Sequence, residues 1–247
     1  MRTLSLVLSL VVSLSVAAAE FEYVVPLAGY AEGSGRTWYY AQAFIRNLSP
    51  RPAELRVTGI YPAAHDARCG LADTVTLAPY ERIVTGLTVC RAQFAAFSFT
   101  SNEKLDIRVE IDSHVTMRSG WDKQVIDAST GWLPAGGDLV AEGIAKRTLQ
   151  RANVLLVNPS DRVLTVQMHV ERPEWDVESD LILEVPARST RLFPLAELPH
   201  PAPPPFIDSA DGRHLIRLRG DGPLQGGVST VSRDGASMYV PLVALAP

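Results

Sequence analysis

Catalytic and nucleotide-binding motifs are missing from this sequence. It contains no His-Glu-x-x-His zinc motif, no Gly-x-Ser-x-Gly nucleophile elbow, no P-loop lysine motif and no Gly-x-Gly-x-x-Gly that opens a helix. The five histidines are scattered at positions 65, 114, 169, 200 and 214, and no two have the spacing of metal ligands. The sequence therefore predicts a protein without enzymatic activity, cofactor or metal site.

Basic residues are too few for a typical nucleic-acid-binding protein. The chain has 23 lysines and arginines against 27 aspartates and glutamates, which gives a formal net charge of -4. A protein that binds nucleic acid independently of sequence needs a basic surface to displace counterions from the phosphates. We therefore expect no nucleic-acid partner.

Long apolar runs are missing after the N-terminal region. Residues 4–16 form such a run, between the basic Arg2 and the small residues 17–19. This order is typical of a cleaved secretory signal peptide, and the run is shorter than the roughly 20 residues that span a bilayer. We expect residues 1–19 to be removed, leaving a mature chain that begins at Glu20 and has no membrane span. Such a protein is secreted or periplasmic, or is associated with the cell surface.

Cysteine is nearly absent, because the chain has two, Cys69 and Cys90. In an exported protein an even pair most simply forms one disulfide. Closing a loop of this length stabilises the folded state by about 3 kcal/mol in the chain-entropy model. Two thiols without an adjacent histidine pair are a poor metal site, so we expect a disulfide between Cys69 and Cys90 and no bound metal.

Strand patterns dominate what the sequence does contain, and no segment has a sustained helical period. From Leu105 to Asp112 apolar residues alternate with charged ones, which predicts a strand with one buried and one solvated face. Turn-forming residues separate similar segments. We expect further strands over residues 38–46, 53–60, 73–77, 81–89, 149–157, 164–170, 181–185, 190–194, 214–219 and 226–232.

A short segment recurs along the chain and suggests a duplication. Val-Pro-Leu at residues 25–27 has related segments around Pro134 and Pro241, and the three prolines are 108 and 107 positions apart. A period of about 108 suits a whole small domain. We therefore expect a first domain over residues 20–128 and a second over residues 129–247, closed by a last copy of the opening strand.

Longer alignments support the same duplication. Residues 36–62 align without gaps on residues 147–173 at an offset of 111, with seven identities. Ile107-Arg108-Val109 also matches Ile216-Arg217-Leu218 at an offset of 109. We expect the small changes in offset to reflect loop insertions.

Short strands with turns about every ten residues predict an all-β fold. We expect two tandem immunoglobulin-like antiparallel β-sandwich domains related by internal duplication. Gly-Ser-Gly-Arg-Thr-Trp at 33–38 and Arg-Asn-Leu-Ser-Pro at 46–50 resemble tandem immunoglobulin-like or fibronectin-III-like repeats of secreted bacterial proteins, of an uncharacterised surface-repeat type. The resemblance lies in structural motifs; it implies the fold and carries no function.

Asn47 admits two interpretations. Asn47-Leu48-Ser49 matches a glycosylation acceptor, whereas Asn158-Pro159-Ser160, in the matching turn, is blocked by its proline. A turn-forming role accounts for both asparagines, and glycosylation accounts for one.

Trp121 and Trp175 are the candidates for ligand contact, because both fall in segments that we expect to be loops. An exposed tryptophan can stack on a sugar ring or anchor a protein interface, although more often it folds back onto its own domain.

These features predict an exported binding or structural module that contacts an envelope or surface protein, or a polysaccharide. A carbohydrate-binding module that uses Trp121 and Trp175 is one alternative. A two-domain periplasmic chaperone for pilus-like subunits is another, but it would require strand donation from an exposed edge, and the basic anchor residues of that family are not found in the sequence.

Overall fold

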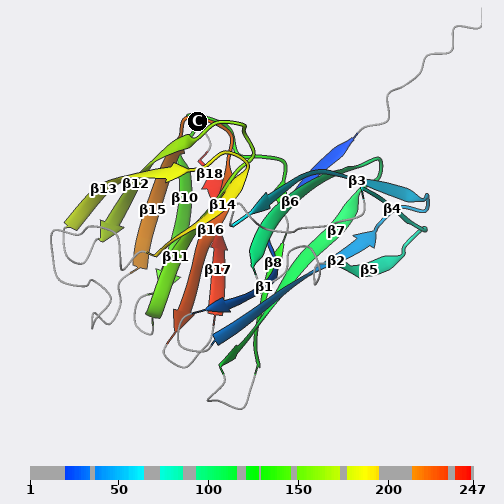
Figure 1. The fold of residues 1–247 in the computed structure, drawn as a ribbon, viewed down its shortest axis with the longest axis horizontal. Helices are drawn as coiled ribbons and strands as arrows, with labels where there is room; N and C mark the ends of the chain where they lie inside the picture. The colour runs from blue at the N-terminus through cyan, green and yellow to red at the C-terminus, as the bar shows by residue number, and fades with distance from the viewer. Residues whose placement is uncertain are drawn as a thin grey trace, which may run out of the picture.

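The computed structural model describes ten segments of the chain, and in them it contains 18 β-strands and no helix (Figure 1). The described residues are 20–33, 37–63, 73–85, 93–115, 121–127, 129–145, 149–172, 177–194, 213–232 and 237–245. The expected all-β class is therefore confirmed. In these segments no helix could cross a membrane.

The strands form two consecutive sets of nine. The first set consists of β1 (Phe21–Gly33), β2 (Thr37–Asn47), β3 (Ala53–Pro62), β4 (Thr74–Leu77), β5 (Arg82–Thr85), β6 (Phe94–Ser101), β7 (Leu105–Val115), β8 (Trp121–Asp127) and β9 (Ser129–Thr130). The second set consists of β10 (Leu139–Ala145), β11 (Leu149–Asn158), β12 (Leu164–Arg172), β13 (Val177–Val185), β14 (Ser189–Pro194), β15 (Arg213–Gly220), β16 (Gln225–Ser232), β17 (Ser237–Pro241) and β18 (Val243–Ala244).

Alternation in the sequence predicts most of these strands. In β7, Leu105, Ile107, Val109 and Ile111 are buried, and the residues between them are more exposed. A strand is present at each of the other ten expected places, with ends that differ by a few residues. β6 was not expected, because residues 95–99 are all buried and show no alternation between an apolar and a polar face.

β1 contributes to both sheets of the first set. Its first part pairs with β6 and its last part pairs with β2, and a bulge between Val25 and Ala28 interrupts the pairing with β6. Pro26 lies in this bulge, a position where the missing N–H of proline is tolerated. Through β1 all nine strands are hydrogen-bonded into one continuous sheet, with the order β4-β3-β6-β1-β2-β7-β8, in which β9 also pairs with β1 and β5 with β2. We refer to its two parts, β4-β3-β6-β1 and β5-β2-β7-β8, as the two sheets of the first set.

The second set forms two sheets, with the orders β13-β12-β15-β10-β18 and β14-β11-β16-β17. Their inner faces enclose a core that includes Leu139, Val154, Leu156, Met168 and Leu218. β10 has a bulge between Ala141 and Ile144, as β1 has between Val25 and Ala28.

The strand pairings of the second set match those of the first. β10 pairs with β15 and β18 as β1 pairs with β6 and β9, and β11 pairs with β14 and β16 as β2 pairs with β5 and β7. The pairs β12–β13, β12–β15 and β16–β17 correspond to β3–β4, β3–β6 and β7–β8. The two sets therefore share one pairing plan, except that β1 also pairs with β2, whereas β10 and β11 lie in separate sheets.

A buried asparagine fixes the turn after β2. The Asn47 side chain donates to the carbonyls of Arg51 and Ala78 at 2.7 and 3.0 Å, and its Oδ1 accepts the N–H of Ser49 at 2.8 Å. Because Asn47 has no exposed surface and its amide nitrogen is hydrogen-bonded twice, the turn-forming role is confirmed.

Asn158 repeats this arrangement after β11. It donates to the carbonyls of Arg162, Val185 and Pro186 at 2.7 to 2.9 Å and accepts the N–H of Ser160 at 2.8 Å. A second turn also recurs, since Tyr80 and Arg188 follow β4 and β13 respectively, and both have positive φ, 61° and 47°.

Two expectations about the repeat are wrong in detail. By pairing, the counterpart of β1 is β10, whereas Pro134 lies in the linker after β9 and Pro241 ends β17. A bulge, a linker and a strand end all tolerate proline, so the motif recurs without marking equivalent strands. The sequence match of residues 107–109 to 216–218 is also wrong. It relates β7 to β15, but by its pairing β15 is the counterpart of β6. The segment between β14 and β15 is longer than that between β5 and β6, and this shifts the offset.

The two sets lie side by side (Figure 1): β14 contacts β3 and β6, β16 contacts β1, and β17 contacts β8 at the edge of the first set's other sheet. Leu155, Val157 and Tyr239 of the second set belong to the same buried cluster as Phe97 and Tyr61 of the first. The Thr190 hydroxyl donates to the Tyr61 carbonyl at 2.6 Å and accepts the N–H of Ala96 at 3.3 Å. Since Tyr61 and Ala96 pair across β3 and β6, β14 contacts both strands of the facing sheet.

The linker, residues 131–138, is bound to both sets. The Trp132 ring packs edge-on against Tyr61, with centroids 5.3 Å apart, and its Nε1 donates to Glu22 at 3.0 Å. Leu133 forms an isolated β-bridge with Leu224 of the second set. These contacts hold the two sets in a fixed arrangement. The expected domain boundary after residue 128 lies just before β9, which pairs with β1.

Candidate functional site

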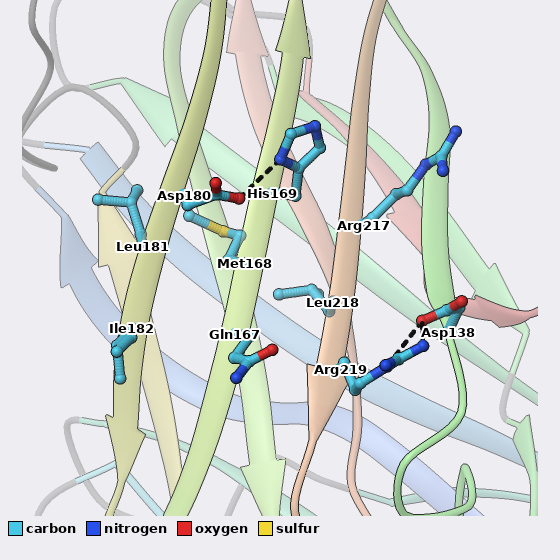
Figure 2. Close-up of a pocket in the computed structure, with 10 residues that line it drawn as sticks. All are labelled: Asp138, Gln167, Met168, His169, Asp180, Leu181, Ile182, Arg217, Leu218 and Arg219. Atoms are coloured by element: carbon cyan, nitrogen blue, oxygen red, sulfur yellow. Dashed lines mark hydrogen bonds and ion pairs between the residues drawn. The ribbon is translucent and has the colours of Figure 1, made fainter.

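Stacking covers one sheet of each set and leaves the other sheet of each set with a solvated face. On the second set this is the outer face of the β13-β12-β15-β10 sheet, which carries a shallow groove of about 600 Å³ (Figure 2). The polar side chains that line the groove are those of Asp138, Gln167, His169, Asp180, Arg217 and Arg219. We call this surface the second-set groove.

Strand alternation and register assemble the groove. In β12, Val166, Met168 and Val170 are buried, so Gln167 and His169 lie on the opposite face. His169 pairs across the sheet with Asp180 of β13 on one side and with Arg217 of β15 on the other. Gln167 is flanked in the same way by Ile182 and Arg219. The groove thus consists of two adjacent cross-strand rows.

Two polar contacts hold the groove's side chains. The His169 Nδ1 lies 2.7 Å from the Asp180 Oδ1, and the Arg219 Nε and Nη2 lie 2.9 and 2.8 Å from the Asp138 Oδ1 (Figure 2). Both pairs are open to solvent, so their net contribution to stability is about 1 kcal/mol or less. At the β13 edge of the groove, Ile182 is 72% exposed, which is the largest exposed fraction among the described large apolar side chains.

The chemistry of this surface suits binding. His169 and Asp180 have the contact of a catalytic histidine and carboxylate, but the residues that line the groove include no serine, threonine or cysteine to act as a nucleophile. The described residues contain no group of three or more histidines, cysteines, aspartates or glutamates that could hold a metal ion. Donors, acceptors and an exposed isoleucine side by side can contact a partner of mixed polarity.

The residues singled out from the sequence lie elsewhere. Trp121 is the first residue of β8 and pairs with His114, so its expected loop position is wrong. The β8 strand was missed because Trp121-Asp122-Lys123-Gln124 shows no apolar alternation. Trp175, Cys69 and Cys90 lie outside the described residues, as does the expected signal segment 1–19.

Sequence reasoning did not identify the second-set groove. The strand patterns predict that His169 and Arg217 lie in strands. Because each is next to an apolar residue, Met168 or Leu218, each is expected on the solvated side of its own strand. Which strands lie next to each other depends on pairing between distant segments, and the sequence pattern does not specify it.

The assignment of this groove therefore rests on its own geometry. Its residues come from β12, β13 and β15, together with Asp138 directly before β10, and they lie next to one another only in the folded sheet. Comparison with protein-family models, with curated proteins and with solved structures gives no match.

Proposed function

We propose that the chain is an exported, non-enzymatic binding protein that contacts an envelope or surface protein through the second-set groove. The observation that carries the proposal is the position of Ile182, a 72% exposed apolar side chain within a row of charged and amide groups on a solvated sheet face. Protein interfaces combine an apolar anchor with a polar rim in this manner.

We further propose that the protein consists of two immunoglobulin-like β-sandwiches related by internal duplication. The shared pairing plan, the matching asparagine turns and the paired positive-φ residues support this view. Removal of residues 1–19 and a disulfide between Cys69 and Cys90 belong to the same proposal, because both are typical of exported β-sandwich proteins.

The test is a pull-down from envelope extract with the mature chain, residues 20–247, as bait. Ile182→Asp places a charge at the β13 edge of the groove, and Val163→Asp is the matched control, since Val163 is a 50% exposed apolar residue of the same set outside the groove. We expect Ile182→Asp to reduce retention of a specific partner about tenfold or more and Val163→Asp to leave it unchanged.

Equal retention by both variants would remove the groove from the proposal. The carbohydrate-binding alternative would be favoured at this site if no protein partner is recovered, the mature chain is retained on insoluble cell-wall polysaccharide, and Ile182→Asp abolishes that retention. Co-purification with subunits that aggregate without the protein would favour the chaperone alternative.

A further inference from the structure

The exposed sheet of the first set carries a concentration of arginines, although the chain as a whole is acidic. Arg46 of β2, Arg82 of β5 and Arg108 of β7 line a second groove of about 470 Å³, together with Phe44 and Tyr80. This volume lies within the range of small-ligand sites. The carboxylates Asp106 and Glu110 stand along one side of the groove, on β7. We call this surface the first-set groove.

Arg46 and Arg82 face each other across two strands without a carboxylate between them. They are direct cross-strand partners of β2 and β5. Within the described part of the chain, neither forms an ion pair, whereas Arg108 lies 3.6 Å from Asp106. Like charges placed directly opposite one another destabilise a sheet. On its other side Arg46 pairs across the sheet with Asp106 of β7, but the described ion pair of that carboxylate is with Arg108, so the side that Arg46 shares with Arg82 has no described carboxylate.

Aromatic side chains shape the same groove. The Arg82 guanidinium carbon lies 4.6 Å from the centroid of the Phe44 ring, and this cation–π contact orients the guanidinium while leaving its N–H groups free to bond outward. Tyr80 is 57% exposed and occupies a left-handed backbone conformation, with φ of 61°, that is uncommon for a tyrosine. The adjacent Glu81 carboxylate fixes this turn by accepting the Ala78 N–H at 2.6 Å.

The equivalent positions of the second set show that the arginines are not required by the strand plan. Arg46 and Arg82 correspond to Val157 and Thr190, which are also direct cross-strand partners. Val157 and Thr190 are fully buried against the first set. The same cross-strand pair of positions is therefore buried between the sets in the second set and is occupied by two exposed arginines in the first.

We propose that the first-set groove binds an acidic polysaccharide through the carboxylate of a uronic acid unit. Arg46 and Arg82 accept the carboxylate between their guanidinium groups, a geometry that arginine matches with paired N–H donors. Tyr80, exposed at the rim, packs on the sugar ring, as aromatic side chains with a polar tip commonly do. The site is separate from the second-set groove and does not depend on the function proposed for it.

The test is titration calorimetry of the mature chain with oligogalacturonate. Arg46→Gln and Arg82→Gln each remove one guanidinium, and we expect each to weaken binding about tenfold, because a charge-assisted hydrogen bond is lost. Arg56→Gln is the matched control, since Arg56 is an exposed arginine of the same set that lies outside the groove. We expect it to change the affinity by less than about twofold, because it removes only an exposed ion pair with Glu54, away from the groove, and alters the long-range charge.

Two further ligands separate the possible sources of the carboxylate. A neutral xylo-oligosaccharide should not bind, and polyglutamate should bind much more weakly than oligogalacturonate. Comparable binding of the neutral sugar would overturn carboxylate recognition, and comparable binding of polyglutamate would overturn the sugar assignment. Absence of oligogalacturonate binding, or equal losses in Arg56→Gln and Arg82→Gln, would overturn the proposal. Thermal unfolding shows that the variants are folded. Arg82→Gln should change the melting temperature little, because the lost cation–π contact with Phe44 and the relieved repulsion with Arg46 act in opposite directions.

Discussion

The two sets of strands share one pairing plan but cover opposite sheets. In the first set the β4-β3-β6-β1 sheet is covered and the β5-β2-β7-β8 sheet is exposed, except at β8, which contacts β17. In the second set the counterpart of the covered sheet is exposed, and the counterpart of the exposed sheet is covered. The pairing plan therefore determines the position of each strand, and the outward side chains determine what each sheet contacts.

Corresponding positions make this difference explicit. Phe44 and Arg46 point outward from β2 beside exposed charges, and Leu155 and Val157 point outward from β11 into the contact between the sets. Arg108, the cross-strand partner of Phe44, corresponds to Gly227, the partner of Leu155. A β-carbon at Gly227 would lie 2.4 Å from the Tyr239 ring, so the glycine makes room for this ring at the interface. Small and apolar outward residues thus favour stacking, and charged ones favour ligand contact.

The largest effect is expected at the pair Leu155 and Phe44. Leu155→Ala removes a fully buried side chain and should lower the free energy of unfolding by about 3 kcal/mol. Phe44→Ala acts at the counterpart position, which is partly exposed, and should cost about 1 kcal/mol through the lost contact with Arg82. Urea denaturation of the mature chain measures both. Equal costs would contradict the conclusion that only the second-set position is an interface.

An intermediate effect, similar in both sets, is expected at the asparagine turns. Asn47→Ala and Asn158→Ala each remove a buried amide and leave part-buried carbonyl groups without their donors, and each should cost about 2 kcal/mol. The same denaturation experiment provides the measurement, with Asn102→Ala as a control, because the one described hydrogen bond of Asn102, from the N–H of Glu54, is exposed. A large cost at one turn and none at the other would show that the turn is not a shared element of the two sets.

The smallest effects are expected at two interface tyrosines, where removal of the hydroxyl should change the free energy of unfolding in opposite directions. The Tyr61 hydroxyl lies 3.2 Å from that of Ser98, whereas the Tyr239 hydroxyl is buried with no hydrogen-bond partner among the described residues. Tyr61→Phe should destabilise the protein by about 1 kcal/mol, and Tyr239→Phe should be neutral or stabilise it by a similar amount. A clear loss of stability in Tyr239→Phe would contradict this assignment.

The pH dependence of unfolding provides a second measurement at Tyr239. Burial raises the pKa of the Tyr239 phenol, so the folded protein keeps it neutral at pH values where the unfolded chain ionises. Its contribution to stability is complete below the unfolded pKa of about 10 and is lost as the pH rises above that value. Tyr239→Phe should therefore reduce the loss of stability in alkali, and an unchanged pH profile would contradict the raised pKa.

Local sequence patterns predict most of the strands. Tertiary contacts determine which strand faces are buried and which residues of distant strands are neighbours, and the local patterns do not show this. Leu105 to Asp112 alternates clearly because one side of β7 faces the core and the other faces solvent. β6 shows no alternation because its outward side is also buried: Ala96 is covered by Thr190 of the other set, and Ser98 is hydrogen-bonded to Thr58 and Tyr61. The candidate grooves were missed for a related reason. His169 and Asp180 are 11 positions apart, and Arg46 and Arg82 are 36 apart, and only the register of the sheet makes them neighbours.

The contact through Thr190 also has a consequence for how the chain can be divided. A fragment that ends in the linker would expose Tyr61, Ala96 and the unpaired face of β6 to water, and the complementary fragment would expose Leu155 and Val157. Apolar sheet faces of this kind drive self-association. Neither half is therefore expected to remain monomeric when it is expressed alone, and the two sets are expected to unfold together as one cooperative unit.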